Sequence, residues 1–224
     1  MSFTAQQSGA TGRTTFAITA LSVLGFFALA CGFFDSEIAT VTYEEAIPID
    51  FDIDADELCP ADQECGEEQA PTDEDIELDP IEESFEIDIV EKTGNDELRD
   101  VTSRMRSLEI TSIDYEVTDN DLTFDLPEVD IFVAPVGVED TDHEDSILLT
   151  TLPSVPAETD DEGRADVIEE NRQASSELFK KMEFEALPRA QPVIQEGQPF
   201  PPSGTAEIVL TINIMITANP TDDI

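Results

Sequence analysis

Apolar and polar residues alternate with a period of two in two long stretches of this chain. In the first, from Ala39 to Ile53, seven of the eight odd-numbered positions are apolar. In the second, from Ala206 to Ala218, every even-numbered position is apolar. This alternation is typical of strands that place one face on a core and the other in water. Pro48 predicts that the first strand lies at the edge of its sheet or divides into two strands.

The segment 108–133 predicts a β-hairpin. Its apolar positions change face once, at residues 111–112, as they would at a β-bulge. We assign the turn to residues 119–121, after which alternation resumes. Pro127 interrupts the return strand, which we therefore expect to bend or to change sheet there.

The remaining patterns are shorter. We expect a short helix that begins at Asn95, a second helix from about Arg164 to Lys181, and a proline-rich connection at 188–202. Further strands are predicted at residues 85–89, 147–152 and 182–186. Strands outnumber helices and no βαβ alternation appears, so the sequence predicts a mainly β fold. Its expected architecture is an antiparallel β-sandwich with immunoglobulin-like layering, decorated by one or two helices.

A different pattern precedes the first strand. The 21 residues from Thr14 to Phe34 carry no charge, Arg13 stands before them, and acidic residues dominate after them. This layout matches an export signal, with a basic start, an apolar centre and small residues ahead of a cleavage point.

The end of this run, Phe27-Ala28-Leu29-Ala30-Cys31, resembles the lipobox of bacterial lipoproteins. The resemblance implies that Cys31 is acylated, that the peptide before it is removed and that lipid holds the mature protein on a membrane. Gly32 follows the cysteine, and in proteobacterial families a residue other than Asp there goes with the outer membrane. We therefore expect a signal peptide at 1–30, a lipid-anchored tether at 31–36 and an extracytoplasmic domain at 37–224.

Two other interpretations of the apolar run stay open. About 20 apolar residues can span a bilayer, so the run could be an uncleaved anchor helix. It could also be a secretory signal that is cleaved after Ala30. All three interpretations place the rest of the chain outside the cytoplasm, because the basic Arg13 lies on the amino side of the run.

Acidic residues dominate the charge. The chain has 53 acidic and ten basic residues, a formal net charge of −43. Such a field repels nucleic acid and anionic lipid headgroups, and we exclude nucleic-acid binding. The stretch 54–83 contains no basic residue and is expected to be an acidic surface loop. Within it, Cys59 and Cys65 are spaced for a local disulfide in an oxidising compartment.

Several acidic clusters are weak candidates for a calcium site. The run from Asp50 to Asp56 is not an EF-hand, because it lacks the required Gly at position six and Glu at position twelve. Two loops remain, one of them around His143. The candidate ligands in these loops are Asp119, Asp121, Asp140, Asp142, Glu144 and Asp145.

No catalytic motif is present. The sequence has no GxSxG, HExxH, P-loop or GxGxxG motif, and a lone His in an acidic loop is a poor candidate for a general base. We expect a non-catalytic structural or protein-interaction module that requires no cofactor. Its expected partners are the membrane, reached through the lipid anchor, and other envelope proteins. A calcium- or small-ligand-binding surface protein, or a hydrolase of unfamiliar type, is the alternative.

Overall fold

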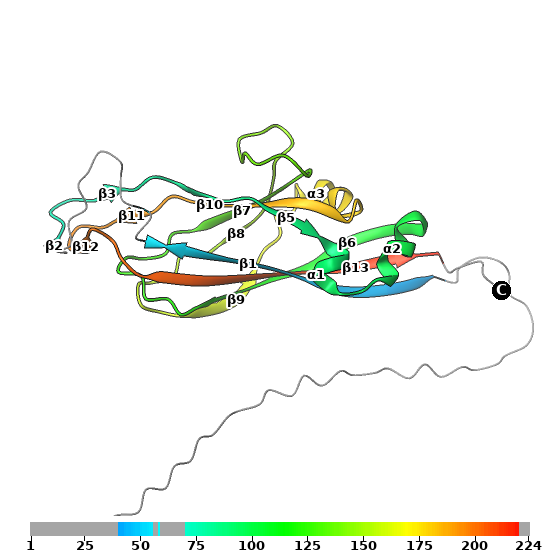
Figure 1. Ribbon diagram of the computed structural model, residues 1–224, viewed down its shortest axis with the longest axis horizontal. Helices are drawn as coiled ribbons and strands as arrows, with labels where there is room; N and C mark the ends of the chain where they lie inside the picture. Colours follow the sequence, from blue (N-terminus) through cyan, green and yellow to red (C-terminus); the bar gives the residue numbers. More distant parts are fainter. Residues whose placement is uncertain (1–39, 56–57, 59–69, 220–224) are drawn as a thin grey trace, which may run out of the picture. The chain divides into compact units, whose positions relative to one another are not determined.

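The computed structural model describes residues 40–55, 58 and 70–219, which form a sandwich of two antiparallel sheets (Figure 1). Sheet I has four strands in the order β1-β13-β6-β9. Its strands are β1 (Val41–Asp54), β6 (Met105–Thr118), β9 (Asp161–Ala165) and β13 (Thr205–Ala218). Within residues 40–55, 58 and 70–219, no helix is long and apolar enough to cross a membrane.

The two long alternating stretches are neighbours in sheet I. Strands β1 and β13 pair along their full length, from Val41 opposite Ala218 to Asp54 opposite Thr205. Every even-numbered position of β13 is buried, as its alternation predicted. Strand β1 has no partner on its other side within sheet I, which confirms the edge position indicated by Pro48.

The predicted bulge is also confirmed. Strands β6 and β13 shift register once near their middle, so that Ser112 faces Asn213 whereas Ile110 faces Ile214. Thr111 is the extra residue, and its hydroxyl donates a hydrogen bond to the Asn213 carbonyl at 3.1 Å. The bulge lets Ile110 and Ile113 both point into the core.

Sheet II lies across the core from sheet I. Its order is β4-β10-β7-β8, and β5 pairs with the same side of β10 as β4 does. The strands are β4 (Ile81–Glu82), β5 (Phe85–Asp88), β7 (Val129–Ala134), β8 (Ile147–Leu152) and β10 (Glu183–Ala190). Two short ribbons complete the β structure: β3 (Ile76–Glu77) with β11 (Val193–Ile194), and β2 (Ala70–Pro71) with β12 (Pro199–Phe200).

The strand order is that of a jelly roll. If β4 and β5 are counted as one interrupted strand, eight main strands remain, arranged 1-8-3-6 in sheet I and 2-7-4-5 in sheet II. This arrangement is two interlocked Greek keys. The predicted mainly β sandwich is therefore confirmed, while the pairing of the first strand with the last distinguishes it from immunoglobulin strand order.

The predicted hairpin at 108–133 is wrong. Strand β6 pairs with β13 and β9, whereas β7 belongs to sheet II, so the chain changes sheet near Pro127 as expected. Leu122, Phe124 and Leu126 are buried in the crossing between the sheets, and this burial produces their alternation. Apart from one isolated bridge between Leu126 and Val155, the crossing has no strand pairing.

The predicted helix from Arg164 to Lys181 is too long. Its first residues belong to β9, which pairs with the free edge of β6, and the helix α3 covers only Arg172–Phe179. Between them the Ile168 amide donates to the Leu149 carbonyl at 2.9 Å, and residues 169–171 form a turn that leads into α3. Pairing with β6 overrides the helical spacing of apolar residues in this segment.

The short helix predicted from Asn95 is confirmed as α2 (Glu97–Val101), which continues into the 3₁₀ turn η2 (Thr102–Arg104) before Met105 begins β6. A further short helix that was not predicted, α1 (Ile89–Thr93), precedes it. Strand β10 runs past Pro188 to Ala190, so the proline-rich connection is shorter than expected. The loop expected at 54–83 includes β2, β3 and β4 in the portion that the structure describes.

Candidate functional site

The helices gather at the end of the sandwich where β1 begins and β13 ends (Figure 1). We call residues 88–106 and 169–183 the helical end. Its two segments meet where the Ile89 amide donates to the Met182 carbonyl at 2.9 Å. The Asn219 amide, just after β13, donates to the Arg104 carbonyl at 3.0 Å. The helical end therefore closes the sandwich beside the first residues of β1.

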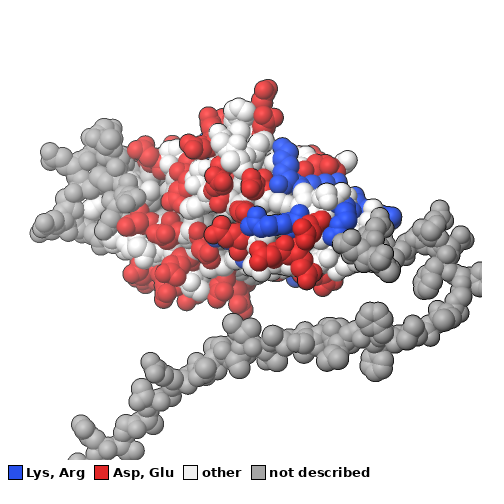
Figure 2. All heavy atoms as spheres, turned by 45° about the vertical axis from the view of Figure 1, so that its right-hand side comes forward, with Lys and Arg blue, Asp and Glu red and all other residues white. Residues whose placement is uncertain are grey.

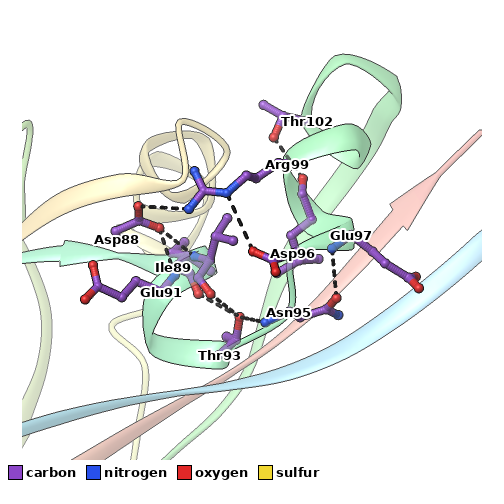
Figure 3. Close-up of polar contacts among 11 residues, drawn as sticks. Asp88, Ile89, Glu91, Thr93, Asn95, Asp96, Glu97, Arg99 and Thr102 are labelled. Carbon is purple, nitrogen blue, oxygen red and sulfur yellow. Dashed lines mark hydrogen bonds and ion pairs between the residues drawn. The ribbon is translucent and has the colours of Figure 1, made fainter.

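Asp88 starts the helical end by capping α1 (Figure 3). Its Oδ1 accepts hydrogen bonds from the amides of Val90 at 2.8 Å and Glu91 at 3.0 Å, as an N-cap carboxylate does. The helix ends at Gly94, whose φ of 66° lies in the left-handed region that glycine tolerates best. The Arg99 guanidinium lies 3.9 Å from the second oxygen of Asp88, which connects α2 to this cap.

Asn95 lies between α1 and α2, where it contacts Thr93 and Glu97 (Figure 3), and it also contacts sheet I. Its Oδ1 accepts from the Glu97 amide at 3.1 Å, while its Nδ2 donates to Glu45 on β1 at 2.6 Å. Lys92 also approaches β1, with its Nζ 3.9 Å from Asp50. These contacts hold α1 and the turn that follows it against the edge strand β1.

Arg104 and Arg106 lie beside the end of β13. Arg104 donates to the carbonyl oxygens of Asp100 at 3.2 Å and Asn219 at 3.0 Å, and Arg106 donates to the side-chain carbonyl of Asn219. All of these acceptors are neutral. Within the described part of the chain, no ion pair joins either guanidinium to a carboxylate.

The basic residues are concentrated at this end (Figure 2). Of the 53 acidic and ten basic residues in the chain, nine acids and seven bases belong to the helical end, which leaves 44 acids and three bases elsewhere. The seven bases are Lys92, Arg99, Arg104, Arg106, Arg172, Lys180 and Lys181. The helical end is therefore close to neutral, while the rest of the surface is strongly negative.

Two of the calcium candidates around His143, Asp140 and Asp142, make contacts within the protein. The loop after β7 is fixed by Arg189 on β10, whose guanidinium lies 3.2 Å from Asp142 and 3.1 Å from Glu82. Asp140 accepts from the Asp142 amide at 2.8 Å, and the His143 ring nitrogen accepts from the Asp145 amide at 3.2 Å. Glu144 lies in the same loop. An arginine therefore supplies the positive charge that this acidic loop faces.

The other two calcium candidates, Asp119 and Asp121, lie in the turn that follows β6. Asp121 accepts from the Thr205 amide at the start of β13, and its own backbone approaches Gly204 so closely that a Cβ there would lie 2.2 Å from the Asp121 carbonyl oxygen. Asp119 precedes it with a φ of 50°. In residues 40–55, 58 and 70–219, no three His, Cys, Asp or Glu side chains are grouped to hold a metal ion.

The three cysteines lie outside the described residues. The lipidation expected at Cys31 and the disulfide expected between Cys59 and Cys65 therefore remain predictions. The same holds for the boundaries of the signal peptide and of the tether.

The outer face of sheet I carries a polar network above shallow depressions. Asn213 donates to Asp114 at 2.7 Å and to Ser112 at 3.1 Å, and Arg164 on β9 donates to Asp114 at 3.0 Å. A depression of about 470 Å³ borders this network and another of about 360 Å³ lies beside Tyr115. Both are open to solvent and lined mainly by strand side chains, so they differ from the enclosed apolar pockets typical of small-molecule sites.

Tyr115 spans the pairing between β6 and β9. It lies opposite Gly163, where a Cβ would come within 2.9 Å of its hydroxyl oxygen, and it donates to Asp161 at 2.8 Å. Burial raises the pKa of Tyr115 above its usual value, and the hydrogen bond and charge of Asp161 raise the pKa further. Only Gly leaves room for this ring, so Gly163 and Tyr115 together attach the edge strand β9.

Sequence reasoning did not identify the helical end. Arg104 lies in η2 and Arg106 lies on β6, beside the end of β13. A signal was available in the spacing of the bases, because no Lys or Arg occurs between residues 14 and 91 or between 107 and 163. The meeting of the two basic segments depends on the fold.

Comparisons with known proteins do not assign a family. No family model matches the chain, and no curated protein matches its sequence significantly. Among solved structures, Desmodium yellow mottle tymovirus aligns over 87% of this chain and 98% of its own, with 10% identity and a TM-score of 0.29. The infectious bursal disease virus Gx strain aligns over 89% of this chain and 43% of its own, with 10% identity and a TM-score of 0.20. At these TM-scores neither likeness bears on function.

Proposed function

We propose that this chain is an exported lipoprotein whose jelly-roll domain is a non-catalytic structural or protein-interaction module of the cell envelope. The observation that carries the proposal is the uncharged run Thr14–Phe34 with Cys31 near its end, which has the layout of a lipoprotein signal. Gly32 after the cysteine favours the outer membrane as the site of anchoring. Other envelope proteins are the expected partners.

The entry into the domain is compatible with a short tether. Nine residues lie between Cys31 and the first strand residue, Val41, and extended chain reaches roughly 3.3–3.6 Å per residue. A lipid on Cys31 would therefore keep the start of β1 within roughly 30–35 Å of the bilayer. Sheet I, with strands of 14 residues, is about 46 Å long, so the anchor would hold the domain by one end.

Two features of the described surface support a module without catalysis. The depressions on sheet I are open and carry strand side chains already engaged with one another. In the 139–145 loop, Asp142 is paired with Arg189 and Asp140 accepts a backbone hydrogen bond. These are properties of a surface built for contact with other macromolecules rather than for enclosing a substrate.

The proposal is tested by expressing the full chain in a bacterium that processes lipoproteins. We expect the intact mass of the membrane-bound protein to show loss of residues 1–30 and an added diacyl or triacyl group. Cys31→Ser should block processing, whereas the matched variant Cys59→Ser should be processed normally. Residues 1–30 still attached to the wild-type protein would contradict the lipoprotein assignment and favour an anchor helix.

A further inference from the structure

The outer face of sheet I is open to solvent along β1, β13, β6 and β9 (Figure 1). Its strand side chains include nine acids and one base, Arg164. The acids are Glu44, Asp50, Asp52, Asp54, Glu109, Asp114, Glu116, Glu162 and Glu207. Arg164 pairs with Asp114 at 3.0 Å, and Lys92 of α1 approaches Asp50 from the edge at 3.9 Å. Even with Lys92 counted, this face is strongly negative.

Four of these acids lie in two directly opposed pairs. Asp52 on β1 is opposite Glu207 on β13, and Glu116 on β6 is opposite Glu162 on β9. All four side chains are exposed, and within the described part of the chain no ion pair joins any of them to a base. Opposed residues of a sheet have Cβ atoms about 4.5–5.5 Å apart, where like charges are destabilising. Each pair therefore favours a positively charged group between its carboxylates.

Like-charged neighbours on sheet II are arranged differently. Glu183 lies opposite Asp88, and Glu185 lies opposite Glu86. One member of each of these pairs is bonded within the protein, because Asp88 caps α1 and Glu185 accepts two hydrogen bonds. The two pairs on sheet I have no comparable internal partner among the described residues, so they remain available to a group from outside.

Each pair on sheet I borders a depression. One of about 550 Å³ is lined by Asp52, Glu207 and Val209, and one of about 300 Å³ is lined by Glu116 and Glu162. Val209 is half-buried and lies between the pairs, since it is opposite Glu116 and follows Glu207 by two residues on the same face. A lysine or arginine side chain has an apolar stem and a charged tip. Depressions with carboxylates at the rim and Val209 beside them suit both parts.

The distance between the pairs favours an extended occupant. They are two residues apart along the strands and two strand spacings apart across the sheet, which is about 12 Å. In an extended chain, residues i and i+4 point to the same side and lie about 13 Å apart. A second copy of this chain is a poor occupant, because its own outer face would bring like charges together. Calcium is also disfavoured, because it takes six to eight oxygen ligands and each pair supplies two carboxylates.

We propose that the outer face of sheet I binds an extended segment of a partner protein that carries Lys or Arg at positions i and i+4 and an apolar residue at i+2. One basic side chain lies between Asp52 and Glu207 and the other between Glu116 and Glu162. The apolar residue contacts Val209. This inference rests on the proposed protein-interaction role and names the chemistry of the partner, and it does not depend on the lipid anchor.

Two synthetic peptides of one composition test the spacing. Thr-Lys-Thr-Val-Thr-Lys-Thr has the proposed pattern, whereas Thr-Lys-Thr-Val-Lys-Thr-Thr places its lysines on opposite sides of an extended chain. Each carries a fluorophore on its amino terminus. Binding to the full chain, purified in uncharged detergent, is followed by fluorescence anisotropy at physiological ionic strength. Because one exposed ion pair changes affinity by up to about fivefold, we expect the first peptide to bind about two- to fivefold more tightly.

Two variants of equal net charge locate the site. Glu207→Gln breaks one carboxylate pair, whereas Glu109→Gln changes an exposed acid of the same face that lies opposite Met215, about 27 Å along the sheet. We expect Glu207→Gln to weaken binding of the first peptide about two- to fivefold and Glu109→Gln to leave it unchanged. Glu207→Gln should also raise the thermal unfolding midpoint of the free chain more than Glu109→Gln does, since it removes the repulsion with Asp52.

The outcomes separate this inference from its alternatives. A preference for the first peptide that only Glu207→Gln reduces supports it. Equal binding of the two peptides, equal loss in both variants, or no binding overturns it. Displacement of the peptide by millimolar Ca²⁺ at matched ionic strength also overturns it and assigns the pairs to a divalent cation. None of these results alters the lipoprotein assignment, which is decided by the mass of the membrane-bound protein.

Discussion

Sheet I and sheet II both bury an apolar inner face, but the outer face of sheet I is exposed to water whereas part of the outer face of sheet II is covered by a loop. Sheet I has three strands of 14 residues whose outer side chains are in contact with water, so that burial alternates along each strand. In sheet II, five successive residues of β10 are buried, from Phe184 to Pro188. The loop after β7 covers this part of the outer face, where Gly137 bonds to Glu185.

The difference has an energetic consequence. An open face requires only that its inner side chains be apolar, because water satisfies the polar groups on the other side. A covered face must satisfy its polar groups from within the protein, since a buried group without a partner costs about 1–3 kcal/mol. Glu185, only 5% exposed, meets this requirement by accepting from Ser84 at 3.1 Å and from the Gly137 amide at 3.0 Å.

The largest effect is expected in the core of sheet I. Ile212 is fully buried at the centre of β13, and Ile212→Ala should lower the free energy of unfolding by about 2–5 kcal/mol through lost burial and a residual cavity. Chemical denaturation measures the loss. Thr211→Ala, on the outer face of the same strand, is the matched control and should change stability by less than about 0.5 kcal/mol. Equal effects at the two positions would show that the faces of sheet I do not differ as described.

The stability of the covered face of sheet II should depend on the Glu185 carboxylate, which accepts its hydrogen bonds. Glu185→Ala leaves the Ser84 hydroxyl and the Gly137 amide without their partner and should cost about 1–3 kcal/mol. It should also speed amide exchange in the loop 135–146. Glu183→Ala, an exposed position on the same strand, provides the control. Unchanged exchange in the loop would mean that Glu185 does not hold it.

The attachment of the edge strand β9 to β6 should become less stable at alkaline pH. Since the folded-state pKa of Tyr115 is raised, its contribution is fully present below the unfolded value of about 10 and is lost as pH rises through the folded pKa. Tyr115→Phe should remove this component of the alkaline loss while costing about 1 kcal/mol at neutral pH for the hydrogen bond to Asp161. The measurement is stability against pH from 8 to about 11.5. Tyr43→Phe, for the other tyrosine, is the control, and identical alkaline profiles for wild type and Tyr115→Phe would contradict the assignment.

The smallest effect concerns a buried hydroxyl of α3. Ser175 is fully buried and its Oγ has no hydrogen-bond partner within the described structure. Ser175→Ala should therefore leave stability unchanged or raise it by up to about 1 kcal/mol, since it removes an unsatisfied group from a helix. Ser176→Ala, one residue further on, is the comparison. A clear loss of stability in Ser175→Ala would reveal a partner for this hydroxyl.

The sequence by itself determined the long strands. The alternation in β13 and the bulge at Thr111 follow from which side chains avoid water, and that preference is recorded residue by residue. The edge position of β1 follows from Pro48, which has no N–H to donate to a second neighbouring strand. The lack of a known catalytic sequence motif and the excess of acidic residues were also visible in the sequence. These features depend only on near neighbours along the chain.

The tertiary structure decided how the strands combine. Pairing of β1 with β13 joins segments more than 150 residues apart, and the placement of β6 and β7 in different sheets replaced a hairpin that local alternation favoured. The strand β9 formed where helical spacing was read, because the free edge of β6 offered backbone partners. The helical end likewise exists only because Met182 meets Ile89, which brings together bases that are distant in the sequence. Pairing and charge clustering depend on backbone groups and on distances through space, and neither is encoded in the local order of residues.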